Sequence, residues 1–269
     1  MMAGFNREKK AFDEAVEAFR TALPHLRSLC QDKPLLIAIG GLTAAGKSML
    51  AATFRKTASD LGESAYVIEG DRFILPKERR RIPEIYPDTV YEIERLRRDI
   101  AALKAGAPAL IPLHHKEGTS TARRSITRCA LQDRLSRGAH IQRHSNLRVI
   151  EAPDLHWAYC RFFAREESRL FIDVETRDLL EEMIPGNAVL IFDSEVALAY
   201  PDLRALYDDS YAICAPRERR RRNFLDAIQK GERYPSLTRE QALAKIEQFF
   251  AEDDRFNMRY LSYARVLIA

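Results

Sequence analysis

The chain alternates short, wholly apolar runs with longer segments whose apolar residues recur every three to four positions. Buried parallel strands have the first pattern, and amphipathic helices have the second. The apolar runs predict strands at about 34–40, 65–68, 188–192, 209–215 and 264–268. The periodic segments predict helices at 7–31, 47–61, 92–104, 217–230 and 239–252. This alternation favours an α/β fold with a parallel five-stranded sheet and helices on both faces.

One long segment does not follow this alternation. Residues 118–186 begin with a region rich in Ser, Thr and Arg, and then suggest an apolar run at 147–152, a strand at 169–174 and a helix at 175–184. We therefore predict a large insertion or an enlarged lid there. Residues 1–32 are expected to form an N-terminal helical preface, and residues 33–269 the main domain.

Composition narrows the class of protein. The chain has 269 residues, of which 46% are hydrophobic and 30% charged, as in ordinary globular proteins. No apolar run approaches the roughly 20 residues of a membrane span, so no membrane partner is expected. The first ten residues lack the apolar core of a signal peptide, and the four cysteines contain no C-x-x-C pair, which predicts a cytoplasmic protein. The sequence leaves open whether the protein forms a homo-oligomer.

Between the first predicted strand and helix lies a glycine-rich segment, Gly41-Leu-Thr-Ala-Ala-Gly-Lys-Ser48, with the pattern G-x-x-x-x-G-K-[ST]. Glycines let the backbone curl so that its N–H groups point at phosphate oxygens, and the helix dipole favours the same anion. Lys47 would reach the β- and γ-phosphates of ATP, and Ser48 would ligate Mg²⁺. A chance glycine turn is the alternative. The expected ATP-binding residues are Gly41, Thr43, Ala44, Ala45, Gly46, Lys47, Ser48 and Met49.

Two acids follow predicted strands, and the carboxyl ends of strands are where ligands bind in open α/β sheets. Asp71 follows the second strand and could accept the proton of an attacking hydroxyl group. Asp193 ends an unbroken apolar run and could hold Mg²⁺, directly or through water. Helix capping or a turn is the structural alternative for each acid.

A cluster of arginines occupies residues 217–222, at the start of a predicted helix. So many adjacent cations cannot all face one way on a helix. We expect Arg221 and Arg222 to stabilise a transferred phosphoryl group, and the others to be solvated. The net charge of +4 suits a small anionic ligand as well as a nucleic acid, but few aromatic residues accompany the arginines, so no nucleic-acid partner is expected.

The order of these segments resembles the phosphoribulokinase/uridine kinase family of P-loop kinases, over most of 34–118 and 187–268. Residues 41–48 match the Walker A loop. Residues 69–73 resemble the family's D-x-F segment, whose acid is the catalytic base. The resemblance therefore implies that Asp71 is the base, and that Phe73 belongs to the acceptor site. It also implies an ATP-dependent kinase that uses Mg²⁺.

Further segments extend the resemblance. Residues 86–88 and 103–115 resemble the uridine-kinase stretch H-P-D, L-K-x-G, I-P-x-Y-D, which suggests Asp88 as a ligand of the acceptor. His114 and His115 replace its Tyr-Asp and are expected to line the acceptor pocket, with a solvated turn as the alternative. The helix at 217–233 is similar to the family's arginine-rich lid. Three departures are Ser194 in place of Gly, Leu225 in place of a lid arginine, and Arg265 in place of an acid.

Two functions are compatible with these features. The first is a kinase that transfers the γ-phosphoryl group of ATP to a hydroxyl of a small polyhydroxy acceptor, such as a sugar, a nucleoside or a sugar phosphate. The second is a nucleotide-binding regulatory or degenerate module that phosphorylates no acceptor. The sequence has neither the N-K-x-D element of GTPases nor the L-S-G-G-Q element of transporter ATPases.

Overall fold

The main sheet of the protein has five parallel strands. The computed structural model describes residues 2–75, 87, 90–107, 109–112, 141–144, 147–150, 169–173, 179–183, 186–229 and 238–268. The strands are β1 (Leu35–Gly41), β2 (Ala65–Glu69), β8 (Val189–Asp193), β9 (Asp209–Ile213) and β10 (Val266–Ile268). Their order is β10-β9-β1-β8-β2, and every neighbouring pair is parallel. The predicted α/β fold with a five-stranded parallel sheet is confirmed.

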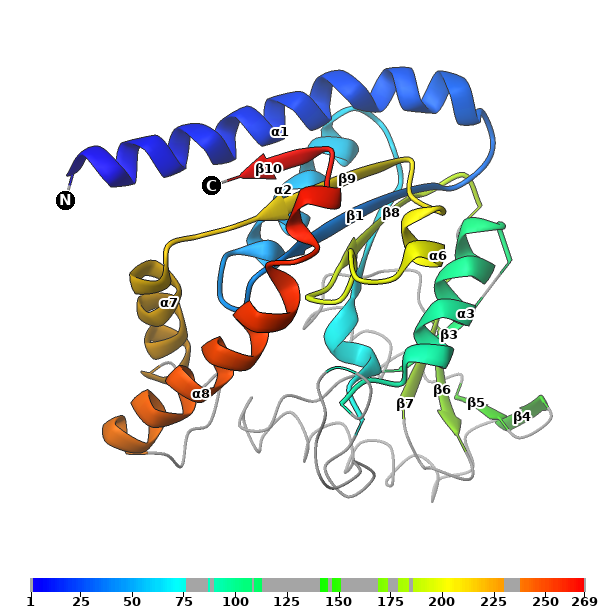
Figure 1. Ribbon diagram of the computed structural model, residues 1–269. Helices are drawn as coiled ribbons and strands as arrows, with labels where there is room; N and C mark the ends of the chain where they lie inside the picture. Colours follow the sequence, from blue (N-terminus) through cyan, green and yellow to red (C-terminus); the bar gives the residue numbers. More distant parts are fainter. Residues whose placement is uncertain are drawn as a thin grey trace.

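Helices cover both faces of this sheet (Figure 1). α1 (Met2–Cys30) and α2 (Lys47–Asp60) pack on one side, and α3 (Ile93–Lys104) and α6 (Pro201–Arg204) on the other. The helices α7 (Arg217–Gln229) and α8 (Arg239–Asn257) pack on each other, and two 3₁₀ turns are η1 (Gly70–Phe73) and η3 (Leu261–Tyr263). The helices predicted at 7–31, 47–61, 92–104, 217–230 and 239–252 are present, and α8 continues beyond the predicted end at residue 252. No helix in the described ranges is long and apolar enough to cross a membrane.

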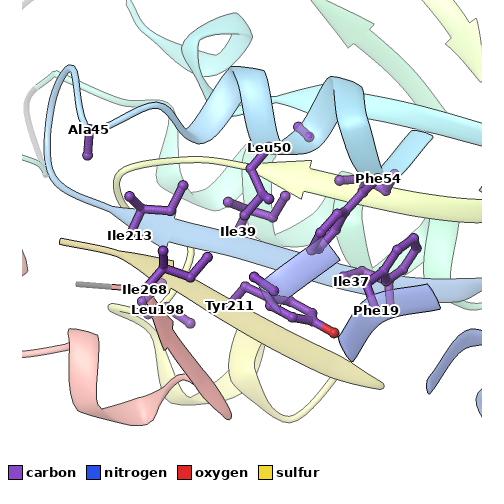
Figure 2. Close-up of a cluster of buried hydrophobic side chains, with 14 of the residues drawn as sticks. Phe19, Ile37, Ile39, Ala45, Leu50, Phe54, Leu198, Tyr211, Ile213 and Ile268 are labelled. Atoms are coloured by element: carbon purple, nitrogen blue, oxygen red, sulfur yellow. The ribbon is translucent and has the colours of Figure 1, made fainter. Parts of the chain in front are cut away.

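The wholly apolar character of β1 follows from burial on both faces. Alternate side chains of a strand point to opposite faces. Leu35, Ile37 and Ile39 pack with α1 and α2, whereas Leu36 and Ala38 pack on the side of α3. On the first side the ring of Phe19 from α1 stacks on Phe54 of α2, with centroids 4.1 Å apart (Figure 2). The predicted division of the chain into an N-terminal helical segment, residues 1–32, and a main domain, residues 33–269, stays a prediction.

The edge of the sheet at the amino ends of β1 and β9 is held by polar contacts. The Asp208 carboxylate accepts hydrogen bonds from the backbone N–H of Leu36, at 2.7 Å, and from Lys104. Arg265 pairs with Asp209 at the start of β9. Arg265, which replaces an acid in the family that the sequence resembles, therefore serves the sheet at its amino-terminal edge.

Four strands from the predicted insertion and one strand that precedes it, β3, form a second sheet, which is antiparallel and has the order β3-β7-β6-β5-β4. Its strands are β3 (Ala109–Pro112), β4 (Ile141–His144), β5 (Leu147–Ile150), β6 (Arg169–Asp173) and β7 (Leu179–Met183). The predicted helix at 175–184 is wrong over β7. Its Leu, Glu and Met residues are good helix formers, but pairing with β3 on one side and β6 on the other overrides that local preference.

Candidate active site

The glycine loop, residues 41–48, leaves the carboxyl end of β1 and enters α2 directly. β1 lies between β8 and β9, so the loop stands where the strand order reverses, and in open α/β sheets that is the ligand-binding crevice. Gly41 has a φ of 137°, and a Cβ atom there would lie 2.3 Å from the carbonyl oxygen of Ile213. Gly46 precedes α2 with a φ of 107°. Both positions require glycine, as the loop pattern predicted.

The middle of the glycine loop is a tight turn with an unusual residue. The backbone N–H of Ala45 donates to the carbonyl of Leu42 at 3.1 Å. Within this turn Ala44 has a φ of 58°, in the left-handed region. That conformation costs an alanine about 1–2 kcal/mol, so contacts outside the turn must hold it.

Lys47 lies inside the curl of the loop and is only 9% exposed. Its Nζ donates to the carbonyl oxygens of Gly41, at 3.2 Å, and Leu42, at 3.0 Å. The same ammonium lies 3.8 Å from a carboxylate oxygen of Glu195. Glu195 also accepts a hydrogen bond from the Thr43 hydroxyl at 2.7 Å. The lysine therefore occupies the centre of the loop with a carboxylate beside it.

Asp193, the last residue of β8, lies next to this lysine. It accepts a hydrogen bond from the Ser48 hydroxyl and is attracted by Lys47, and both lower the pKa of its carboxyl group. Burial has the largest effect and raises that pKa to about 6, with smaller contributions from the charges of Asp71 and Glu69. The structure thus brings Lys47, Ser48, Asp71 and Asp193 together, as the sequence predicted from their places at strand ends.

Asp71 comes close to Asp193 because the chain turns tightly after β2. Glu69 pairs with Asp193 in the register of β2 and β8, and η1 begins at the next residue. A Cβ atom on Gly70 would lie 2.1 Å from the Ser194 hydroxyl oxygen, so only glycine lets η1 lie against the end of β8. The Ser194 hydroxyl itself accepts from the backbone N–H of Val196 at 3.2 Å.

The group of Ser48 and Asp193 fits Mg²⁺. Both side chains offer oxygen ligands, and Mg²⁺ is usually held by one or two carboxylates together with phosphates of the substrate. The buried Asp193 carboxylate is disfavoured as an anion in its apolar surroundings, and a bound cation would offset this cost. Among the described residues, no cluster of three or more His, Cys, Asp or Glu side chains could hold a metal. Ser48 and Asp193 therefore suit a cation that takes its other ligands from the phosphates of a nucleotide.

The arginines of α7 have separate surroundings. Arg220 is 1% exposed, and its guanidinium lies 2.7 Å from Asp254 and 3.5 Å from Asp253, both on α8. Arg221 and Arg222 are exposed, and Arg221 lies 3.9 Å from Glu247. The predicted role of Arg221 and Arg222 on a phosphoryl group stays a prediction.

The predicted acceptor residues are only partly within the described chain. Phe73 is 1% exposed and packs in the core beside α3. It therefore has almost no surface free to contact an acceptor. Asp88, His114 and His115 lie outside the described residues. Met49, predicted to bind ATP, is exposed on the first turn of α2.

Sequence reasoning missed Glu195, Asn223 and Asp253. The signal for Asp253 lies in α8, whose buried positions are Ala242, Ile246, Phe250, Asp253 and Asn257. Their spacing of three and four residues forms one helical stripe, which is apolar at first and polar at its end. A charged residue in a buried stripe marks a contact with another polar group. Here that group is the backbone of the glycine loop.

The raised pKa of Asp193 predicts an unusual pH dependence of stability. Because its folded pKa of about 6 lies above the ordinary 3.8, the folded state holds more protons than the unfolded state between roughly pH 4 and 6. The free energy of unfolding should therefore fall as the pH rises through this window. Asp193→Asn removes the charge and should raise the free energy of unfolding at pH 7.5 by up to about 3 kcal/mol.

Urea unfolding with EDTA at pH 4.5, 6 and 7.5 measures this effect without bound cations. The variant should keep a shallower pH dependence, because burial also raises the pKa of Asp253 to about 6. A variant that is less stable than wild type at pH 7.5 would show that the ionised Asp193 stabilises the fold.

These features define the class of fold. A glycine loop between a central parallel strand and the following helix, in a five-stranded sheet covered on both faces, is the P-loop NTPase type.

Comparison with known proteins supports this fold class. One similar solved structure comes from Silicibacter sp. TM1040 and is provisionally named a fructose transport system kinase. It has a TM-score of 0.56 and 17% identity, and the match covers 94% of this chain and 98% of the other. A protein from Bacillus stearothermophilus, provisionally named a uridine kinase, matches with a TM-score of 0.45 and 15% identity, over 96% and 97% of the two chains. No family profile and no curated sequence matches the chain. The match to the Silicibacter structure confirms the predicted fold.

Proposed function

We propose that the protein is an ATP-dependent kinase that phosphorylates a hydroxyl group of a small polyhydroxy acceptor. The observation that carries the proposal is the convergence of Lys47, Ser48, Asp71 and Asp193 at the point where the strand order reverses. Phosphoryl transfer requires a cationic cradle for the phosphates, oxygen ligands for Mg²⁺ and a group that orients the attacking hydroxyl. The four side chains can supply these three requirements from adjacent strand ends.

Each residue has a distinct role in this proposal. Lys47 exchanges its contacts with the loop carbonyls for phosphate oxygens and stabilises the negative charge that develops on them. Asp71 orients the acceptor hydroxyl in line with the phosphorus atom and accepts its proton at a carboxylate oxygen. Ser48 and Asp193 hold Mg²⁺, which when bound neutralises charge on the β- and γ-phosphates. Arg221 and Arg222 are the candidates to cover the transferred group from α7.

Two departures from the resembled family have structural roles, which weakens the case for a degenerate module. Ser194 bonds the backbone of Val196 and packs against Gly70. Leu225 packs on an apolar cluster between α7 and α8, so its position serves the contact between those helices. The provisional name of the Silicibacter neighbour makes hexoses the first acceptors to examine.

The test is ADP release from Mg²⁺-ATP by the purified protein, with and without a panel of sugars, sugar phosphates and nucleosides. We expect one class of acceptor to raise ADP release well above the background of hydrolysis, and the phosphorylated acceptor to appear in equal amount. ATP binding with no turnover for any acceptor, or hydrolysis that no acceptor changes, would instead favour a regulatory module.

A further inference from the structure

Helices α7 and α8 lie side by side next to the segment that joins β1 to α2 (Figure 1). They are held together by Phe224 of α7 with Ile246 and Phe250 of α8. Ala44, the left-handed residue of the glycine loop, packs against the same cluster. The helix pair is therefore in direct apolar contact with the strained part of the loop.

Two hydrogen bonds from the helix pair hold the backbone on either side of this contact. The Asp253 carboxylate accepts from the backbone N–H of Thr43 at 2.6 Å. The Asn223 side-chain amide donates to the carbonyl of Ala44 at 2.9 Å. One bond comes from α8 and the other from α7, and together they span the two residues that set the turn.

The Asp253 carboxylate is itself fixed in place. It is 2% exposed, accepts a hydrogen bond from the Asn257 amide, and lies 3.5 Å from the guanidinium of Arg220. Arg220 is held in turn by Asp254 and by the ring of Phe250, whose centroid is 4.3 Å away. Burial and these partners leave the carboxylate little freedom to turn away from the loop.

We propose that Asp253, with Asn223, is a positioning residue that holds the glycine loop in the shape that binds nucleotide phosphates. The inference rests on the proposed function, because it concerns how that site is prepared for its nucleotide. Phosphate binding by such a loop depends on several N–H groups pointing at one place. An alanine in the left-handed region does not keep that shape by itself. The helix pair thus sets the phosphate affinity of the loop.

ADP affinity, measured by calorimetry, tests this inference. Asp253→Ala should weaken ADP binding at least about tenfold, because a charge-assisted hydrogen bond to the loop is lost. Asp254→Ala is the matched control, since it removes the same charge and the same Arg220 partner one residue away but bonds no loop group. Losing a negative charge near phosphates would by itself strengthen binding, so weakening confined to Asp253→Ala identifies the lost hydrogen bond.

Asp253→Asn should recover most of the affinity, because an amide oxygen can still accept from Thr43. If Asp253 only stabilised the fold, Asp253→Ala and Asp253→Asn would have the same ADP affinity whenever their thermal stabilities were equal. If Asp253→Ala does not fold, Asn223→Ala provides the same test, because Asn223 of α7 is only half-buried. The expected loss of ADP affinity is about threefold, from one neutral hydrogen bond.

Hydrogen exchange of the amides at 42–46 without nucleotide gives a second, independent readout. Exchange should be faster in Asp253→Ala than in Asp254→Ala. Equal exchange in the two variants, or equal ADP affinity, would overturn the inference while leaving the proposed function intact. If the wild-type protein binds no ADP, the proposed function fails separately, and the exchange result alone decides whether Asp253 positions the loop.

Discussion

Replacing Asp71 by asparagine should lower the rate of phosphoryl transfer to the acceptor by about 100- to 10,000-fold, the usual contribution of a positioned general base. Asparagine keeps the size of the side chain but accepts no proton. Because Asp71 stands at the end of β2 and the glycine loop follows β1, ADP affinity should change little. Single-turnover transfer and ADP calorimetry together measure this separation of chemistry from binding.

Glu69→Gln is the matched control for Asp71→Asn. Both carboxylates lie near Asp193 and raise its pKa, so removing either charge should have a similar electrostatic effect on the metal-binding side chain. Glu69, however, is half exposed and lies 3.5 Å from Arg72, and no proton transfer is assigned to it. We expect the control to keep transfer within a few-fold of wild type. Full activity in Asp71→Asn, or an equal loss in Glu69→Gln, would remove Asp71 from the role of base.

The main sheet was predictable because its central strands β1 and β8 are buried on both faces, whereas each helix is buried along one face. A strand such as β1 must then be wholly apolar, and the glycine loop must carry glycine where the backbone meets β9. The convergence of Asp71 and Asp193 followed from the same topology, since carboxyl ends of parallel strands share one edge.

The sequence-based predictions failed where contacts between residues far apart in the chain determine the structure. β7 has the composition of a helix, and only its pairing with β3 and β6 makes it a strand. The arginine cluster of α7 appeared uniform in sequence, yet Arg220 is buried by acids of α8 that are more than thirty residues away. The buried stripe of α8 includes Asp253 as a polar position, but its partner in the glycine loop is a backbone N–H group, and the side-chain pattern does not identify that partner.

Replacing Lys47 by alanine should abolish acceptor-dependent ADP release, with a loss of at least about 100-fold in turnover, the magnitude expected for a preorganised group that stabilises transition-state charge. Expressed as free energy, the loss of turnover should exceed any loss of folding stability, because Lys47 lies where the phosphates are proposed to bind. Its Nζ already contacts two carbonyl oxygens of the glycine loop, and incoming phosphate oxygens would replace them. Steady-state kinetics over a range of ATP concentrations separates lost turnover from lost affinity.

The same substitution should change the titration of the site, which gives a readout free of any acceptor. Lys47 lowers the pKa of both Asp193 and Asp253, so without it both values should rise above about 6. Lys47→Ala should therefore lose more stability relative to wild type at pH 7.5 than at pH 5, where these carboxyl groups are largely protonated. Lys56→Ala is the control on the same helix, because Lys56 is exposed and, within the described part of the chain, its ion pair is with Asp60 one turn away. Transfer that survives Lys47→Ala at the wild-type rate would show that the glycine loop does not hold the phosphoryl donor.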